Sequence, residues 1–237
     1  MRKGAQTLVR MGASLMVLIF GGAAAVAQSK QPCLDDAMIV FDASKSMAAS
    51  VGDEKGLRRI DVVRSALANV LPRVAPRRRM GLITYGPGSR DACSNVFLQL
   101  KPTSNAATKI MSRVDALKPE GRTPLTRAVR GAAEVLNFRN KAATIIVLTD
   151  GEETCGADPC ALARELKRDG AGTVVHVISY EIASAVGSDG EFVSRCFADE
   201  TGGTYVDTKT IDEVRNALET ALSCPLISDA RDAIGPR

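Results

Sequence analysis

The sequence predicts an α/β fold, a doubly wound, mostly parallel six-stranded sheet with one antiparallel edge strand and helices on both faces. Short apolar, β-branched runs alternate with stretches whose apolar residues recur at helical spacing, an order typical of a parallel sheet between helical layers. The run at residues 143–149, ATIIVLT, is almost continuously apolar, as expected of a central strand covered on both faces. A Gly-Pro-Gly turn at 86–88 joins two predicted strands directly, which predicts the antiparallel edge pair.

In the first half of the chain, apolar residues of 60–74 follow the helical period, whereas 37–41 is a short buried run that ends at Asp42. Thr123 and Pro124 together predict a helix start, with Thr123 as the N-cap and Pro124 at the first helical position. The predicted elements are strand 37–41, helix 60–74, strands 80–85 and 96–100, and helices 106–117 and 124–136.

In the second half, glycines mark the helix ends, since Gly170 follows one helical pattern and Gly202-Gly203 follow another. The predicted elements are strands 143–149, 173–180 and 204–206, and helices 159–168, 191–199 and 211–222. There is no internal repeat, low-complexity segment or linker. We therefore expect one domain, residues 36–224.

The N-terminus has the features of an export signal. Arg2, Lys3 and Arg10 precede an apolar stretch, and Ala-Val-Ala at 25–27 is a small-x-small cleavage site. We expect residues 1–27 to be a signal peptide, with a retained N-terminal anchor as the alternative. A mature chain without a membrane span then resides in the periplasm or is secreted, and consists of an N-terminal segment (28–35), the domain and a C-terminal tail (225–237).

Charge argues against a nucleic-acid-binding protein. The chain has 31 Lys and Arg residues against 27 Asp and Glu residues. The expected signal contributes three of the basic residues and no acidic ones, which leaves 28 against 27, without the excess of basic residues that nucleic-acid binding requires. About 210 mature residues suit one domain with a substantial core, and we expect a monomer.

The six cysteines all follow the expected cleavage site, and an even number in an exported chain favours disulfides. Cys33 lies just before the first predicted strand, at the edge of the sheet where that strand begins. Cys224 ends the last predicted helix, which returns to the same edge. We therefore expect a Cys33–Cys224 disulfide that joins the two ends of the domain.

The other four cysteines lie on connections at the opposite edge and can pair in three ways. Cys93 leaves the hairpin at one side of the sheet, while Cys196 lies several strands away, at about 4.8 Å per strand. This span disfavours Cys93–Cys196 and, with it, a local Cys155–Cys160 bridge. We expect Cys93 to pair with Cys155 or Cys160, and Cys196 with the remaining one.

Polar residues cluster where the strands of the predicted sheet end, which is where ligands bind in such folds. Strand 37–41 is followed by Asp42, Ser44 and Ser46, and strand 143–149 by Asp150; Thr123 enters a helix between them. Carboxylates and hydroxyls are hard oxygen donors that suit Mg²⁺, with Mn²⁺ or Ca²⁺ as alternatives. The sequence predicts a divalent-cation site at this edge.

These motifs resemble the metal-ion-dependent adhesion site (MIDAS) of von Willebrand factor A domains: D-x-S-x-S at 42–46, Thr123 in GRTPL and Asp150 in TDGEE. The likeness spans roughly residues 36–222, and the stretch from 150 to 166 is similar to bacterial exported members. The resemblance implies that Ser44 and Ser46 bind the metal directly, Thr123 directly or through water, and Asp42 and Asp150 largely through water. It also implies that an acidic residue of a protein partner completes the coordination.

The resulting hypothesis is an exported, metal-dependent, adhesion-type protein-binding module that is not an enzyme. Arg122, Glu152 and Glu153 lie near the predicted metal residues and are candidate partner contacts. One alternative is a structural or assembly subunit of an envelope complex whose metal site does not capture the partner. A second is a metal-assisted hydrolase, which needs a base, and the single histidine, His176, lies inside a predicted strand.

Overall fold

The structure is a computed structural model of the whole chain. The chain divides into two compact units, residues 1–30 and 31–237, and every described residue belongs to the second. The expected signal peptide (1–27) and C-terminal tail (225–237) lie outside the described residues. These are 33, 35–51, 56–88, 92–180 and 193–224.

Six strands form one sheet in the order β3-β2-β1-β4-β5-β6. All neighbouring strands are parallel except β2 and β3, which pair antiparallel and place β3 at one edge. This confirms the predicted fold class. The strands are β1 (Asp36–Asp42), β2 (Met80–Tyr85), β3 (Val96–Thr103), β4 (Ala143–Thr149), β5 (Thr173–Tyr180) and β6 (Tyr205–Thr208).

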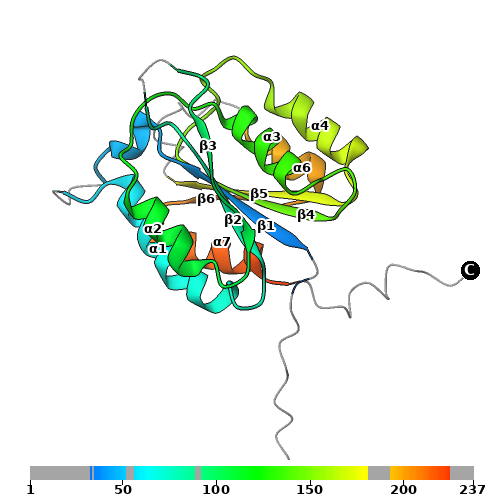
Figure 1. Cartoon of the computed structure of the whole chain (residues 1–237). Coiled ribbons are helices and arrows are strands. Elements are labelled where there is room, and N and C mark those ends of the chain that lie inside the picture. The colour runs from blue at the N-terminus through cyan, green and yellow to red at the C-terminus, as the bar shows by residue number, and fades with distance from the viewer. Residues whose placement is uncertain (1–32, 34, 52–55, 89–91, 181–192, 225–237) are drawn as a thin grey trace, which may run out of the picture. The chain divides into compact units, whose positions relative to one another are not determined.

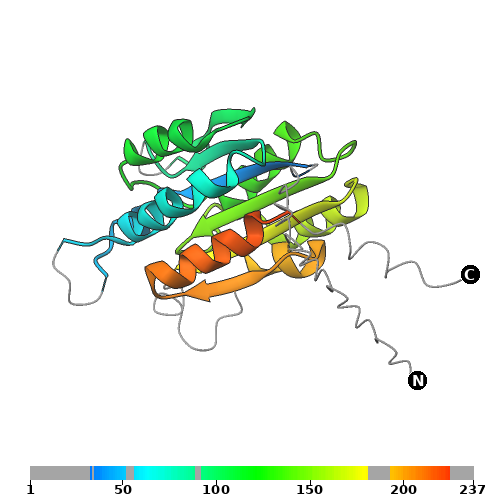
Figure 2. The same cartoon turned by 90° about the horizontal axis from the view of Figure 1, so that it is seen from below.

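Helices cover both faces of the sheet (Figure 1). One layer contains α1 (Arg59–Val74), α2 (Ala107–Asp115) and α7 (Ile211–Leu222), and Figure 2 shows α1 and α7 side by side on that face. The other layer contains α3 (Leu125–Val135), α4 (Pro159–Asp169) and α6 (Arg195–Thr201). A short 3₁₀ helix, η1 (Lys45–Ala48), follows β1 directly.

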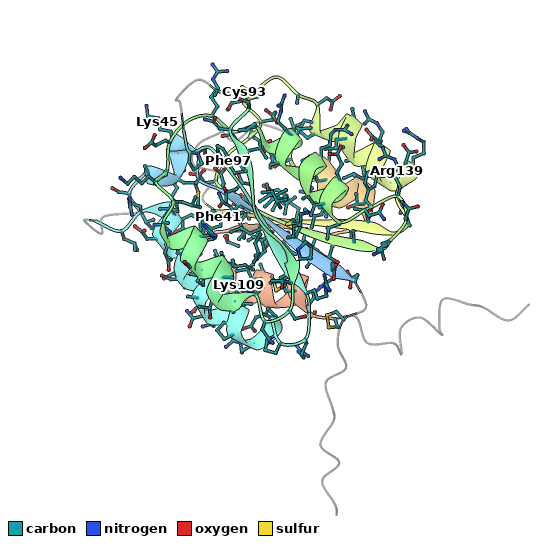
Figure 3. The ribbon with its side chains drawn as sticks, viewed as in Figure 1. Phe41, Lys45, Cys93, Phe97, Lys109 and Arg139 are labelled. Atoms are coloured by element: carbon teal, nitrogen blue, oxygen red, sulfur yellow. A yellow bond between two sulfur atoms is a disulfide. The ribbon has the colours of Figure 1, made fainter. Side chains whose placement is uncertain are left out.

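The alternation of side chains along each strand separates two hydrophobic cores. In β1, Ile39 and Phe41 pack with α1, α2 and α7, while Met38 and Val40 pack with α3, α4 and α6. Figure 3 shows Phe41 in the interior of the molecule. All four side chains have no exposed surface, which explains why β1 is apolar on both faces and ends only where polar residues begin.

Some element boundaries differ from the sequence prediction. Helix α3 begins at Leu125 with Pro124 at the capping position, so the prediction that Thr123 is the N-cap is wrong. The helix predicted over 191–199 is α6, which begins at Arg195 within the described residues. The 3₁₀ helix η1 was not predicted, because four residues are too few to show a period.

Three disulfides join the six cysteines. Cys33–Cys224 connects the segments before β1 and after α7, as predicted, with a Cα–Cα distance of 5.2 Å. Cys93–Cys155 and Cys160–Cys196 form the pairs at the other edge. Both agree with the expectation that Cys93 pairs with Cys155 or Cys160. Within the described part of the chain, no helix is long and apolar enough to cross a membrane.

Candidate metal centre

The two predicted carboxylates lie at the carboxyl ends of neighbouring central strands. Asp42 is the last residue of β1, and Asp150 follows directly after β4. The parallel pairing of Phe41 with Leu148 places both strand ends at the same edge of the sheet. In Figure 3 two labelled residues mark this edge: Lys45, in η1, and Cys93, in the connection between β2 and β3. The fold therefore brings together the aspartates that the sequence keeps more than 100 residues apart.

The Asp42 carboxylate is completely buried and held on both oxygens. Its Oδ1 accepts a hydrogen bond from the backbone N–H of Ser44 (2.7 Å), and its Oδ2 accepts one from the hydroxyl of Thr149 (2.6 Å). Burial and the negative charge of Asp150 nevertheless raise the pKa of Asp42 to about 6. A positive charge nearby would therefore stabilise the ionised carboxylate of Asp42.

The Ser46 hydroxyl links Ser44 to Asp150. The Oγ atoms of Ser44 and Ser46 lie 3.0 Å apart, and Ser46 donates a hydrogen bond of 2.7 Å to Oδ1 of Asp150. Asp150 and Ser44 are buried, whereas Ser46 is exposed. The oxygens therefore run from the buried strand ends to the surface.

Thr123 lies on a loop that is fastened to both strand-end segments. The loop is joined to the segment after β1 by the hydrogen bond from Lys45 N to Gly121 O (3.2 Å). A hydrogen bond from Thr154 N to Thr123 O (3.1 Å) joins the loop to the segment after β4. Thr123 is buried, and its hydroxyl has no hydrogen-bond partner among the described residues. The loop that carries Thr123 thus lies against both segments that carry the other candidate donors.

The structure also places a positively charged side chain beside Asp150, which the sequence did not predict. Arg59, the first residue of α1, donates from Nη1 to Oδ2 of Asp150 at 3.0 Å. Its side chain is only 11% exposed and that of Asp150 is 0% exposed. Because 91 residues separate the pair, no local spacing in the sequence could have revealed it.

A chain of buried hydrogen bonds orients the Asp42 carboxylate. Tyr85, the last residue of β2, donates to the Thr149 hydroxyl at 3.1 Å, and Thr149 donates to Asp42. All three side chains are buried. Such outer hydrogen bonds fix the orientation of a carboxylate ligand.

Glu152 and Glu153, the candidate partner contacts, have intramolecular hydrogen bonds. Glu152 accepts from the backbone N–H and the hydroxyl of Ser194 (2.9 and 2.8 Å). Glu153 accepts from the backbone N–H groups of Thr126 (2.8 Å) and Cys155 (2.6 Å). Glu153 therefore satisfies an N–H group at the start of α3, the role that the sequence assigned to Thr123.

Arg122, the third candidate, has an exposed side chain that donates from Nη1 to the carbonyl of Thr154 at 3.2 Å. It therefore lies on the surface between the loop that carries Thr123 and the segment that follows Asp150.

The donor set suits a hard divalent cation. It consists of two buried carboxylates and three hydroxyls, all oxygen, from Asp42, Ser44, Ser46, Thr123 and Asp150. Among the described residues, no group of three or more His, Cys, Asp or Glu side chains is placed to hold a metal. A cation here would thus depend on hydroxyls and water, as Mg²⁺ sites commonly do.

An α/β sheet with oxygen donors at its carboxyl edge defines a class of proteins that bind ligands there. Comparison with known proteins indicates which family within this class the chain resembles. Residues 37–153 match the family model of the von Willebrand factor type A domain. The chain is 26% identical over 181 residues to the uncharacterized protein YwmD of Bacillus subtilis (strain 168), a match that covers 68% of this chain and 79% of YwmD. YwmC of the same strain is 23% identical over 185 residues, or 74% of this chain and 78% of YwmC.

Solved structures share the fold. The VWA domain of SpRpn10 has a TM-score of 0.59 and 14% identity, with 78% of this chain and 93% of that chain covered. The pilus adhesin SpaC from Lactobacillus rhamnosus GG has a TM-score of 0.61 and 17% identity, covering 82% of this chain and 30% of SpaC. Proximal thread matrix protein 1 from the mussel byssus, with a zinc-occupied MIDAS motif, has a TM-score of 0.54 and 14% identity over 81% of this chain and 48% of that one. The family model and the shared fold support the von Willebrand factor type A family for this chain.

Proposed function

We propose that this chain is an exported, metal-dependent protein-binding module of the adhesion type. A divalent cation, Mg²⁺ first among the candidates, would be held at the carboxyl edge of the sheet, and an acidic residue of a protein partner would complete its coordination. The observation that carries the proposal is the chain of contacts that links the two buried carboxylates: Ser44 N to Asp42 (2.7 Å), Ser44 Oγ to Ser46 Oγ (3.0 Å) and Ser46 Oγ to Asp150 (2.7 Å).

The roles of the residues follow from their surroundings. Asp42 and Asp150 supply negative charge in a buried environment, where the attraction for a cation is stronger than in water. Ser44, Ser46 and Thr123 supply neutral oxygens, so that their side chains do not cancel the remaining charge of the ion. When bound, the cation would supply a positive centre that an incoming carboxylate recognises.

Further observations support an exported binding protein. Three disulfides in residues 33–224 favour an oxidising compartment. The similar structures include a pilus adhesin and a protein described with a zinc-occupied MIDAS motif. The only histidine, His176, lies in the middle of β5, opposite Ile146 of β4, and contacts Thr204, just before β6, at 2.9 Å.

The test is a thermal unfolding titration of metal-stripped protein with Mg²⁺, Mn²⁺ and Ca²⁺. At a hundredfold excess over its dissociation constant a cation stabilises the folded state by about 2.7 kcal/mol, or roughly 5 to 10 °C for a chain of this size. Asp42→Ala should abolish the shift. The matched control is Asp169→Ala, which removes an exposed aspartate at the end of α4 and should keep the shift. If no cation shifts the wild type, or if Asp42→Ala responds equally, the proposal fails.

A second experiment addresses the partner. The wild type and Asp42→Ala are used as baits on the native envelope fraction, in Mg²⁺ and again in chelator. A protein that is retained only by the wild type and only in Mg²⁺ is the expected result. Capture of the same protein by both baits, regardless of chelator, indicates instead an assembly subunit whose partner binds elsewhere.

A further inference from the structure

The connection between β4 and α4 carries Asp150 and has little regular structure of its own. Residues 150–158 contain no helix or strand, and most of residues 154–158 are exposed. A segment of this kind has few packing contacts to fix its backbone, so its position depends on particular bonds to neighbouring segments. Those bonds therefore decide how the residues that follow Asp150 lie against the other loops of the candidate centre.

Hydrogen bonds hold this connection against the loop that carries Thr123. Thr154 N donates to the Thr123 carbonyl (3.1 Å), and Thr123 N donates to the Thr154 hydroxyl (2.8 Å). Glu153 accepts from the backbone N–H groups of Thr126, at the start of α3, and of Cys155. The backbone around Glu153 and Thr154 is thus fastened to the start of α3 and to the loop before it.

The same connection is joined covalently to the connection between β2 and β3, through the Cys93–Cys155 disulfide. The β2–β3 connection begins at Gly86, which lies directly against the segment that follows β1. A Cβ atom at Gly86 would lie 2.4 Å from the carbonyl oxygen of Ala43 and 2.4 Å from the backbone nitrogen of Ser44. The disulfide therefore ties the connection after Asp150 to a segment that contacts the D-x-S-x-S motif.

These contacts join four segments at the candidate centre in a closed series. Lys45 N donates to the Gly121 carbonyl, which joins the segment after β1 to the loop that carries Thr123. That loop is joined to the connection after β4, which is joined through Cys93 to the β2–β3 connection and so back to the segment after β1. In Figure 3, Lys45 and Cys93 lie at the same end of the molecule. The disulfide is the covalent link of the series, so its removal takes a fixed tether from the connection after Asp150.

We propose that Cys93–Cys155 is a positioning cross-link of the candidate metal centre, which holds the connection after β4 in the arrangement that binds the cation. A connection with more freedom occupies that arrangement for a smaller fraction of the time, and the apparent affinity for the cation falls by that fraction. The inference rests on the proposed function, since it concerns the affinity of the same site. A purely structural role for the disulfide would lower the stability of the fold and leave the cation affinity of the folded protein unaltered.

The experiment compares this disulfide with a matched cross-link at the opposite edge of the sheet. Cys93→Ser/Cys155→Ser removes the proposed positioning bond, and Cys33→Ser/Cys224→Ser is the control. Because the cysteines of the control lie 191 residues apart and not 62, the control should lose more stability in thermal unfolding. The Mg²⁺ dissociation constant of metal-stripped protein, measured by calorimetry, should show the opposite order. The first variant should bind Mg²⁺ about tenfold more weakly than the wild type, since its binding arrangement would be occupied about a tenth of the time, and the control should keep the wild-type value.

Hydrogen exchange in the metal-free protein provides a second readout, which requires no bound ion. The backbone N–H groups of Thr123, Thr126 and Thr154 donate across the contacts that hold the connection. In Cys93→Ser/Cys155→Ser they should exchange at least about tenfold faster than in the wild type, because the connection opens locally. In the control variant the same groups should keep their wild-type rates.

Unchanged Mg²⁺ affinity or unchanged exchange rates in Cys93→Ser/Cys155→Ser overturn this proposal, as does an equal loss of Mg²⁺ affinity in the control. Failure of both this variant and Cys93→Ala/Cys155→Ala to fold also overturns it, since the bond then serves the whole fold. If the wild type binds no cation, the proposed metal function itself is wrong, and the exchange rates alone then decide whether the disulfide positions the connection.

Discussion

The hydroxyl of Ser46 donates a 2.7 Å hydrogen bond to Oδ1 of Asp150, although 104 residues separate the two positions. This contact joins the segment after β1 to the segment after β4 across the carboxyl edge of the sheet. The Ser46 hydroxyl is also 3.0 Å from that of Ser44, so it links a neutral oxygen donor to a charged one. The geometry of the candidate centre therefore depends on the pairing of β1 with β4, which fixes both strand ends.

The hydrogen bonds that orient the Asp42 carboxylate can be tested with two variants, Thr149→Val and Tyr85→Phe. Thr149→Val removes the hydroxyl that donates to Asp42 Oδ2 and leaves the buried Tyr85 hydroxyl without its acceptor. We expect Mg²⁺ binding, measured by calorimetry, to weaken by about tenfold, the usual cost of losing an outer hydrogen bond at a metal site. Tyr85→Phe should weaken it less, because Thr149 can still donate to Asp42. Equal effects of the two variants would contradict this ordering.

The buried ion pair at the opposite edge should respond unequally to loss of its two partners. Arg78, with a side chain 1% exposed, pairs with Asp35, which is 20% exposed. Asp35→Ala leaves a buried guanidinium without its counter-charge, so we expect a loss of about 3 kcal/mol in the free energy of unfolding. Arg78→Met should cost less, because the remaining carboxylate can be solvated.

Denaturant unfolding at neutral pH measures this difference. The exposed pair of Arg73 with Glu219 provides the control, since both side chains are about half exposed. Glu219→Ala should change the free energy of unfolding by no more than about 1 kcal/mol. A larger loss in Arg78→Met than in Asp35→Ala would show that packing of the arginine, and not its charge, dominates.

The Cys33–Cys224 disulfide joins segments 191 residues apart at the edge opposite the candidate centre. Replacing both cysteines with serine should lower the free energy of unfolding by about 2 to 5 kcal/mol, since the open chain gains entropy mainly when unfolded. The Mg²⁺ dissociation constant of the folded variant should be unchanged, because the strand ends that carry Asp42 and Asp150 are not altered. A parallel loss of Mg²⁺ affinity would instead show that the two edges are coupled.

The sequence alone predicted the order and type of the main elements and the members of the candidate centre. Apolar runs such as 143–149 are fixed by burial on both faces, and the helical period of 60–74 is fixed by burial of one face. The D-x-S-x-S motif begins at the end of a buried strand, so its place at a sheet edge was predictable from chain order. The Cys33–Cys224 pair was predictable for the same reason, since both cysteines flank terminal elements.

Only the tertiary structure decided which groups surround the centre. Arg59 reaches Asp150, and Glu153 reaches the start of α3, through contacts between residues 91 and 27 positions apart. Likewise, Cys93 pairs with Cys155 and not with Cys160 because of how the segment after Asp150 is placed. Local periodicity and propensity report burial and backbone preference, whereas a side chain's partner depends on where separate loops meet once the sheet has formed.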